Sequence, residues 1–491
     1  MRRFFMCVVL LLAAPVFGAE PKLNVLFIAV DDLRPDLGCY GNAIVQSPNI
    51  DRLAAQGIQF NQAYCQLALC NPSRASLLSG RRPETLGVYD LATFLRKNNP
   101  DVVTLPELFK NSGYRTIRFG KIFHATNGNH DDRQSWSEKN AAEPEAAPAP
   151  ASKGARERNA KKEPGRAPRA DDPEAADHSH ELPYGSPDVG DDALPDGKIA
   201  RAAVGALEQY KDQPFFLAVG FHKPHLPVVA PKKYWDLYDA EKIGLSPNPA
   251  HPQGAPEFAS NNSSELRRYK GVPEEGAIPE AIARNVRHGY YACATYVDAQ
   301  IGKLLEALDK LDLRKNTIVI LWGDHGYQLG DHGTWTKRTN WQIATRVPLI
   351  LSAPGQKNAG AKTAALVELV DVYPTLAELC GLTLPPKLEG TSLAPLMADP
   401  ERKWKTAAFS VYQKNVPGLG TVLGRAIQTE RYRLIEWSAE KGEKRFYELY
   451  DHQNDPAENT NVADHPDQKQ LVDQLTARLH AGWRAATPEK E

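Results

Sequence analysis

The run Asn24-Val25-Leu26-Phe27-Ile28-Ala29-Val30, followed at once by Asp31-Asp32, decides the fold class. A continuous apolar run of this length predicts a strand that is buried on both faces, as in a parallel sheet covered by helices. Residues 215–220 and 317–322 have the same character, and residues 115–120 are also strand-like. Residues 196–210 and 281–311 are predicted to be helices, the second with one apolar stripe at helical spacing. The chain is therefore predicted to be an α/β protein with a large, mostly parallel sheet flanked by helices.

Length and composition predict how the chain is divided. A chain of 491 residues is too long for a single compact hydrophobic core of ordinary size. We therefore expect a large domain over residues 20–400 and a smaller α+β domain over residues 401–491. Short alternating runs after residue 400 predict a small antiparallel sheet, closed by a helix over residues 464–483. Residues 141–176 are rich in Ala, Pro, Glu, Lys and Arg, which predicts a disordered surface insert.

The first residues read as a targeting segment. Arg2-Arg3 precede an apolar stretch over residues 4–14, and small residues follow, so residues 1–19 are predicted to be a signal peptide. We therefore expect an exported protein, periplasmic or secreted. A net charge of -1 gives no global attraction for nucleic acid, and no stable membrane association is expected. The cysteines are too few and too scattered for a disulfide scaffold.

Two predicted strands end in pairs of metal-type side chains. Asp31-Asp32 follow the first strand, and Asp324-His325 follow the strand at residues 317–322. Ligands gather at the carboxyl ends of strands in open α/β sheets, so these pairs are expected to converge. Such a carboxylate-rich set favours a hard divalent ion, Ca²⁺ before Mg²⁺.

The stretch Cys70-Asn71-Pro72-Ser73-Arg74 predicts a helix start. Asn71 would be the N-cap and Pro72 the first helical residue. Cys70 would then lie just outside a helix N-terminus, where a thiol is expected to have a lowered pKa.

This stretch, with Leu78-Ser79-Gly80-Arg81 after it, resembles the signature of the formylglycine-dependent sulfatases. The segments around Asp31-Asp32, Gly120-Lys121 and His222-Lys223-Pro224-His225 resemble the iduronate-2-sulfatase group within that family. The resemblance runs from about residue 24 to residue 461. It implies an alkaline-phosphatase-like fold with a small C-terminal antiparallel subdomain, and a hydrolase that cleaves a sulfate ester on a uronic acid or related sugar.

The resemblance also implies a set of roles. A formylglycine-generating or equivalent maturation enzyme would oxidise Cys70, and the hydrated aldehyde would attack sulfur and later expel sulfate with its second hydroxyl. One Ca²⁺ would be held by Asp31, Asp32, Asp324, His325 and the residue formed from Cys70. The remaining roles divide between holding the formylglycine diol (Arg74, Lys121 and His124) and gripping the sulfate while assisting the leaving oxygen (His225 and Lys337). A sulfated saccharide would be the substrate, and Tyr327 could stack on its sugar ring.

Other functions remain open at this point. A phosphatase or phosphodiesterase on the same scaffold would normally have Thr or Ser in place of Cys70. A hydrolase that uses Cys70 with His124 as a thiol nucleophile would leave the two acidic pairs unexplained. A non-catalytic sugar-binding protein would have no need of the basic residues.

Overall fold

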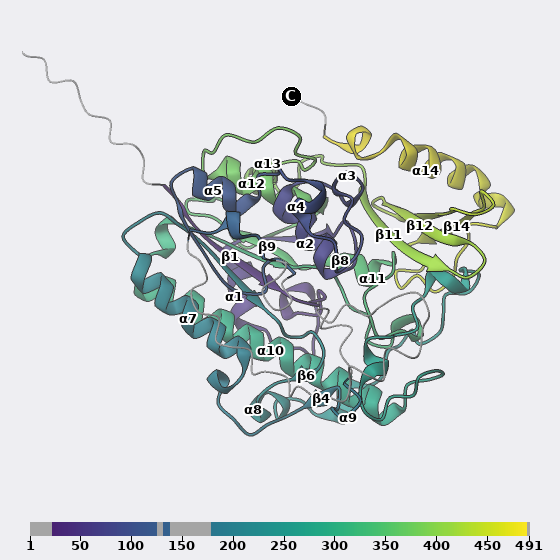
Figure 1. The fold of residues 1–491 in the computed structure, drawn as a ribbon, viewed down its shortest axis with the longest axis horizontal. Coiled ribbons are helices and arrows are strands. Elements are labelled where there is room, and N and C mark those ends of the chain that lie inside the picture. The colour runs from purple at the N-terminus through teal and green to yellow at the C-terminus, as the bar shows by residue number, and fades with distance from the viewer. Residues whose placement is uncertain (1–21, 125–130, 138–177, 489–491) are drawn as a thin grey trace, which may run out of the picture.

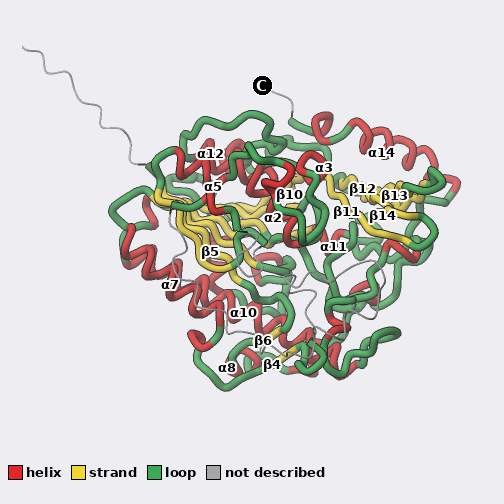
Figure 2. The backbone as a smooth tube through the Cα atoms, viewed as in Figure 1, coloured by secondary structure: helices red, strands yellow, loops and turns green. Residues whose placement is uncertain are grey.

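The computed structural model describes residues 22–124, 131–137 and 178–488. Its main body is a twisted sheet with helices on both faces (Figures 1 and 2). The strand order is β10-β2-β9-β7-β1-β5-β3, and β8 pairs with β2. The strands are β1 (Asn24–Val30), β2 (Ile58–Tyr64), β3 (Arg115–Gly120), β5 (Phe215–Phe221), β7 (Thr317–Gly323), β8 (Arg346–Val347), β9 (Leu349–Ser352) and β10 (Ala361–Glu368). Strands β3, β5, β1 and β7 run parallel, whereas β9 is antiparallel to both its neighbours, so the predicted mostly parallel sheet is confirmed.

The central strand β1 faces two hydrophobic cores because its side chains alternate between the faces of the sheet. Leu26, Ile28 and Val30 pack into a core with α1 (Pro48–Gln56), α7 (Pro195–Tyr210) and α10 (Glu280–Lys310). Val25, Phe27 and Ala29 pack into the opposite core, with α2 (Cys70–Ser79), α5 (Leu105–Asn111) and α12 (Val372–Leu379). A strand covered on both sides has no polar face, which is why its sequence is apolar from Val25 to Val30.

The chain ends in a smaller antiparallel sheet, with the order β11-β12-β13-β14, covered by α14 (Figure 1). Its strands are β11 (Ala408–Val416), β12 (Gly420–Gln428), β13 (Tyr432–Ala439) and β14 (Arg445–Asp451). The helix α14 spans Lys469–Ala481 and is preceded by a short 3-10 turn, so it begins five residues later than predicted. The small antiparallel sheet is confirmed, while the domain boundary at residue 400 stays a prediction.

Short elements complete the described fold. They are α3 (Pro83–Leu86), α4 (Leu95–Asn98), β4 (Tyr184–Gly185), β6 (Val228–Val229), α8 (Lys232–Trp235), α9 (Ala240–Ile243), α11 (Gln342–Thr345) and α13 (Ala394–Ala398). The cysteines of the described residues are all free thiols, in line with the sequence. The predicted signal peptide and the predicted insert over residues 141–176 lie outside the described residues.

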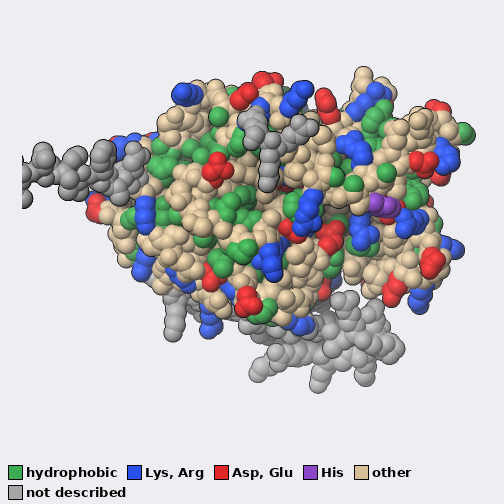
Figure 3. Space-filling view, turned by 90° about the horizontal axis from the view of Figure 1, so that it is seen from above, with side chains coloured by type: hydrophobic (Ala, Val, Ile, Leu, Met, Phe, Trp, Pro, Cys, Tyr) green, Lys and Arg blue, Asp and Glu red, His purple; other side chains and the backbone are tan. Residues whose placement is uncertain are grey.

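The surface carries mixed charge. On the face seen in Figure 3, acidic and basic side chains are interspersed, which agrees with the net charge of -1. Among the described helices, none combines the length and the apolar character needed to cross a bilayer.

Candidate active site

Four neighbouring parallel strands bring their carboxyl ends to one edge of the main sheet. In register, Val30 at the end of β1 pairs with Gly323 of β7 and with Phe221 of β5. Asp31-Asp32 and Asp324-His325 therefore leave adjacent strands side by side. The Asp32 backbone N–H donates to Asp324 Oδ1 at 3.1 Å, so the two predicted pairs do converge.

The end of β3 delivers Lys121 to the same place. Gly120 has a φ of 68°, and a Cβ atom there would lie 2.0 Å from the carbonyl oxygen of Gly220. Only glycine permits this close turn. It allows Lys121 Nζ to reach Asp31 Oδ2 at 2.5 Å.

The helix that carries Cys70 starts earlier than the sequence predicted. The helix α2 begins at Cys70 itself, and its N-cap is Leu69, which makes no side-chain capping bond. The Asn71 amide instead donates to the backbone carbonyls of Asp90 and Thr93, at 2.7 and 2.9 Å. The predicted Asn71 cap is therefore wrong: a tertiary contact uses the side chain that local reasoning assigned to capping.

Cys70 lies at the centre of the cluster. Its Sγ is 3.2 Å from His325 Nε2 and 3.4 Å from Asp31 Oδ1, and its side chain is fully buried. Burial, with Asp31 adding to it, raises the pKa of the thiol well above its usual value. The predicted lowered pKa is wrong, because desolvation and a neighbouring carboxylate outweigh Lys121, Lys337 and the helix end.

Arg74 joins the two acidic pairs from below. It projects from α2 and is fully buried, with Nε 2.8 Å from Asp324 Oδ2 and a terminal nitrogen 3.3 Å from Asp31 Oδ1. It also donates to the backbone carbonyl of Ile122 at 3.1 Å. The guanidinium therefore ties together the segments that follow β1, β7 and β3.

The basic neighbours make Asp31 strongly acidic. Burial alone would raise its pKa, but Lys121, His225 and Arg74 hold it well below its usual range. The pKa of Asp32 is raised by burial, although Lys337 acts against this. The pair of carboxylates is thus not fully compensated by the protein's own cations, which suits a site that takes a further positive ion.

Most of the predicted metal ligands come together. One potential ligand atom from each of Asp31, Asp32, Cys70 and His325 lies within 4.8 Å of all the others. The Asp324 carboxylate is turned towards Arg74, with Oδ2 3.6 Å from His325 Nε2. Asp32 Oδ1 is buried and makes no hydrogen bond in the described part of the chain, although the Lys337 ammonium lies 3.3 Å away. These residues fit a cation.

A second set of charged groups lies beside Asp32. Lys337 Nζ, fully buried, is 3.3 Å from Asp32 Oδ1 and 3.0 Å from Glu265 Oε2. His225 Nε2 is 3.2 Å from Glu265 Oε1. The sequence analysis predicted Lys337 and His225 but missed Glu265, which lies between α9 and α10 in a segment without periodicity or motif. Only its contacts identify it.

Two other residues named in the sequence analysis are buried, and one of them, Tyr327, interacts electrostatically with Glu265, Asp32 and Lys337. His124 is buried in the loop after β3, at 3% exposure. Tyr327 is also buried, its hydroxyl donates to the Trp335 carbonyl at 3.1 Å, and its ring stacks on Tyr290. A residue packed in this way offers no face to a sugar, so the stacking prediction is wrong.

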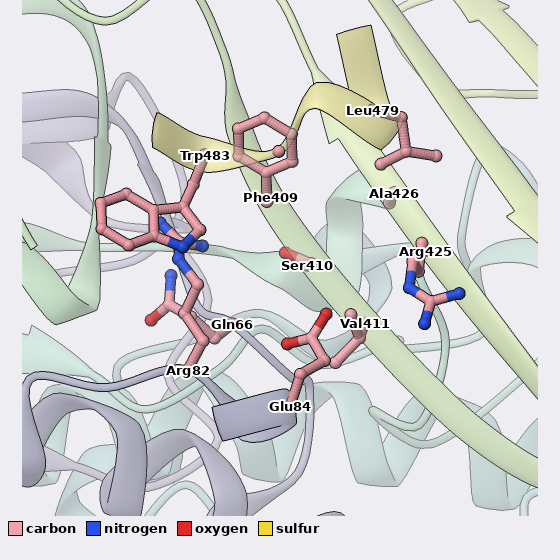
Figure 4. A pocket seen from close by; sticks show the side chains of 11 residues that line it. Gln66, Arg82, Glu84, Phe409, Ser410, Val411, Arg425, Ala426, Leu479 and Trp483 are labelled. Atoms are coloured by element: carbon pink, nitrogen blue, oxygen red, sulfur yellow. The ribbon is translucent and has the colours of Figure 1, made fainter. Parts of the chain in front are cut away.

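A separate cavity of about 300 Å³ lies between α3 and the C-terminal sheet (Figure 4). It is lined by side chains that include Trp483, Phe409, Arg82 and Arg425. None of the predicted site residues lines it, so this cavity is distinct from the cluster around Cys70.

Comparison with known proteins identifies the family of the chain. A sulfatase family model matches residues 23–382, and a model of the C-terminal part of N-sulphoglucosamine sulphohydrolase matches residues 330–484. The chain belongs to the sulfatase family. It is accordingly a sulfuric ester hydrolase.

The relatives cover most of the chain. The iduronate 2-sulfatase of Mus musculus is 39% identical over 417 residues, which span 78% of this chain and 73% of the mouse protein. A sulfatase of Formosa agariphila is 33% identical over 94% of this chain and 88% of its own length. The solved phosphonate monoester hydrolase of Silicibacter pomeroyi has a TM-score of 0.73 at 22% identity, over 95% of this chain and 96% of that one. The fold is thus the predicted alkaline-phosphatase-like one.

Proposed function

We propose that the protein hydrolyses a sulfate ester on a uronic acid or related sugar, in the manner of iduronate-2-sulfatase. The observation that carries this is the convergence of Asp31, Asp32 and His325 on Cys70. Arg74 contacts Asp31 of this cluster and the neighbouring Asp324. An identity of 39% to an iduronate 2-sulfatase supports the substrate class.

The proposed nucleophile is a formylglycine made from Cys70. When formed, it supplies a hydrated aldehyde whose two hydroxyls allow attack on sulfur and later release of sulfate. As a thiol in this buried setting, Cys70 is a poor nucleophile, because its pKa is raised. Because the side chain is fully buried, a maturation enzyme would have to act before the chain completes folding. Residues 1–19 support export as the accompanying localisation.

The same change alters the proposed metal site. Two carboxylates, a histidine nitrogen and a thiol form a mixed donor set, whereas replacing sulfur by oxygen makes the set rich in hard ligands. Asp31, Asp32, Asp324, His325 and the modified residue would then hold one Ca²⁺, which would polarise sulfate oxygens.

The basic residues of the site would have two roles, orienting the nucleophile and binding the sulfate. Arg74 and Lys121 contact Asp31 and lie next to Cys70, so they would orient the nucleophile, together with His124. Lys337 and His225 lie beyond Asp32, where they would bind the sulfate and meet the charge that develops on the leaving oxygen.

Two measurements test the proposal. The mass of the tryptic peptide that contains Cys70 should show sulfur and two hydrogens replaced by one oxygen. A panel of defined sulfated disaccharides, phosphate diesters and phosphonate esters should be tested as substrates. The rate of hydrolysis should be higher for uronate 2-sulfates than for glucosamine 6-sulfates and for the phosphorus esters. An unmodified thiol in active protein would exclude the formylglycine route. Preferential hydrolysis of the phosphorus esters would favour the alternative function, a phosphatase or phosphodiesterase.

A further inference from the structure

Glu265 contacts both His225 and Lys337, the two basic residues proposed above to bind the sulfate. It is 6% exposed, and its two carboxylate oxygens are used separately: Oε1 is 3.2 Å from His225 Nε2, and Oε2 is 3.0 Å from Lys337 Nζ. One carboxylate therefore spans the two side chains and sets their separation.

The orientation of His225 is fixed from both sides of its ring. Its Nδ1 lies 2.8 Å from the backbone carbonyl oxygen of Leu226. A carbonyl only accepts hydrogen bonds, so Nδ1 carries a hydrogen, and Nε2 is the ring nitrogen that lies close to Glu265. Loss of Glu265 would remove the contact at Nε2.

Lys337 is held between two carboxylates, Asp32 at 3.3 Å and Glu265 at 3.0 Å. Asp32, His225 and Glu265 offer ligand atoms within 4.8 Å of one another, an arrangement that could also suggest a second metal. The Lys337 ammonium contacts both carboxylates of that group, so the positive charge there is already supplied by the chain. Glu265 is the counter-ion of a lysine.

Glu265 itself lies in an anchored segment. The Trp335 backbone N–H donates to Ser263 Oγ at 2.8 Å, which ties the segment to the stretch that carries Lys337. Lys414 of β11 donates to the Ser260 carbonyl at 2.6 Å, which ties it to the C-terminal sheet. A carboxylate on such a segment can hold its partners in place at little entropic cost.

We propose that Glu265 is a positioning residue of the reaction: it holds Lys337 and His225 where the sulfate is bound and where charge develops on the leaving oxygen. This inference rests on the proposed function of the site. The proposal predicts the direction in which sulfate affinity changes when the charge of Glu265 is removed. A negative charge that only lies near a sulfate would repel the sulfate. Removing that charge would then strengthen sulfate binding, whereas removing a positioning group weakens it.

The test compares Glu265→Gln and Glu265→Asp with wild type. Glu265→Gln keeps the shape and removes the charge, and Glu265→Asp keeps the charge and shortens the arm. Inhibition by inorganic sulfate reports binding, while turnover of 4-nitrophenyl sulfate and of a sugar sulfate compares a good with a poor leaving group. Glu458→Gln is the matched control, because Glu458 is another buried carboxylate that contacts an arginine and a histidine, Arg433 at 2.9 Å and His452 at 2.8 Å.

We expect both Glu265 variants to bind sulfate about tenfold more weakly and to lose about 100-fold in kcat/KM on the sugar sulfate. The loss on 4-nitrophenyl sulfate should be about tenfold smaller, since that leaving group needs little assistance. Glu458→Gln should lower thermal stability and leave the ratio of the two substrates unchanged.

Tighter sulfate binding by Glu265→Gln, with Glu265→Asp like wild type, would overturn the proposal, as would equal losses on both substrates. If Glu265→Gln does not fold, Glu265→Asp alone tests the proposal, through the ratio of kcat/KM on the sugar sulfate to kcat/KM on 4-nitrophenyl sulfate. Failure of the wild type to turn over any sulfate ester would refute the proposed function instead, and sulfate affinity would still test Glu265.

Discussion

Replacement of Arg74 by methionine should make the stability of the protein depend strongly on calcium. Arg74 is fully buried and contacts two carboxylates, Asp324 at 2.8 Å and Asp31 at 3.3 Å. Methionine fills much of the volume and leaves both carboxylates without this partner. Breaking a buried ion pair costs about 3–5 kcal/mol, a large share of the roughly 5–15 kcal/mol that holds a typical domain folded.

Calcium should restore part of that loss. A dication held by the cluster would return a positive neighbour to the buried carboxylates that lose Arg74, so in excess Ca²⁺ the cost of Arg74→Met should fall by about half. Urea unfolding, followed by tryptophan fluorescence in chelator and in Ca²⁺, measures both values. The difference between the two conditions is the decisive quantity.

Arg82→Met is the matched control. Arg82 is also buried, and it forms a paired contact with Glu368 at 2.8 and 2.7 Å, without contact to the metal-type residues. Its loss should destabilise the protein by a similar amount, equally with and without Ca²⁺. If Arg74→Met lost the same free energy in both conditions, the inferred coupling between Arg74 and the cation site would be refuted.

Further predictions concern the nucleophile, the sulfate contact, the metal and acid stability. Cys70→Ser should give at most one slow turnover and a persistent sulfated serine, detectable by mass, because serine lacks the second hydroxyl; repeated turnover near the wild-type rate would contradict this. Lys337→Ala should lower kcat/KM by about two to three powers of ten through the loss of a charge at the sulfate, with formylglycine still present by mass. Chelation should abolish turnover and lower the Tm, with Ca²⁺ restoring both; full activity in excess chelator, with no metal in the protein, would refute the site. Burial alone would raise the pKa of Glu368, but Arg82 and Lys405 hold it at about 2, below the usual 4.5. Its stabilising effect is therefore present above pH 4.5 and lost as the pH falls towards 2, so Glu368→Gln should cost about 3 kcal/mol at neutral pH and flatten the acid dependence of urea unfolding.

The sequence determined the elements whose signals are local. The apolar run of residues 24–30 specified a strand buried on both faces. The acidic and histidine pairs directly after β1 and β7 specified which side chains gather at one edge of the sheet. The long helix α10 lies within one residue of the predicted range at each end, because its apolar stripe continues through many turns. The family signature likewise depends on contiguous residues, so it could be found without a fold.

The tertiary structure decided what depends on contacts between distant parts of the chain. Asn71 caps no helix because carbonyls of a later loop accept its amide hydrogens. The pKa of Cys70 rises because the fold buries the thiol and, in addition, brings Asp31 beside it. Glu265 meets Lys337 across 72 residues of sequence, and no local pattern marks it. Hydrophobic periodicity records which face of an element is buried, whereas charge, desolvation and hydrogen bonding at a site are set by whatever other element packs against it.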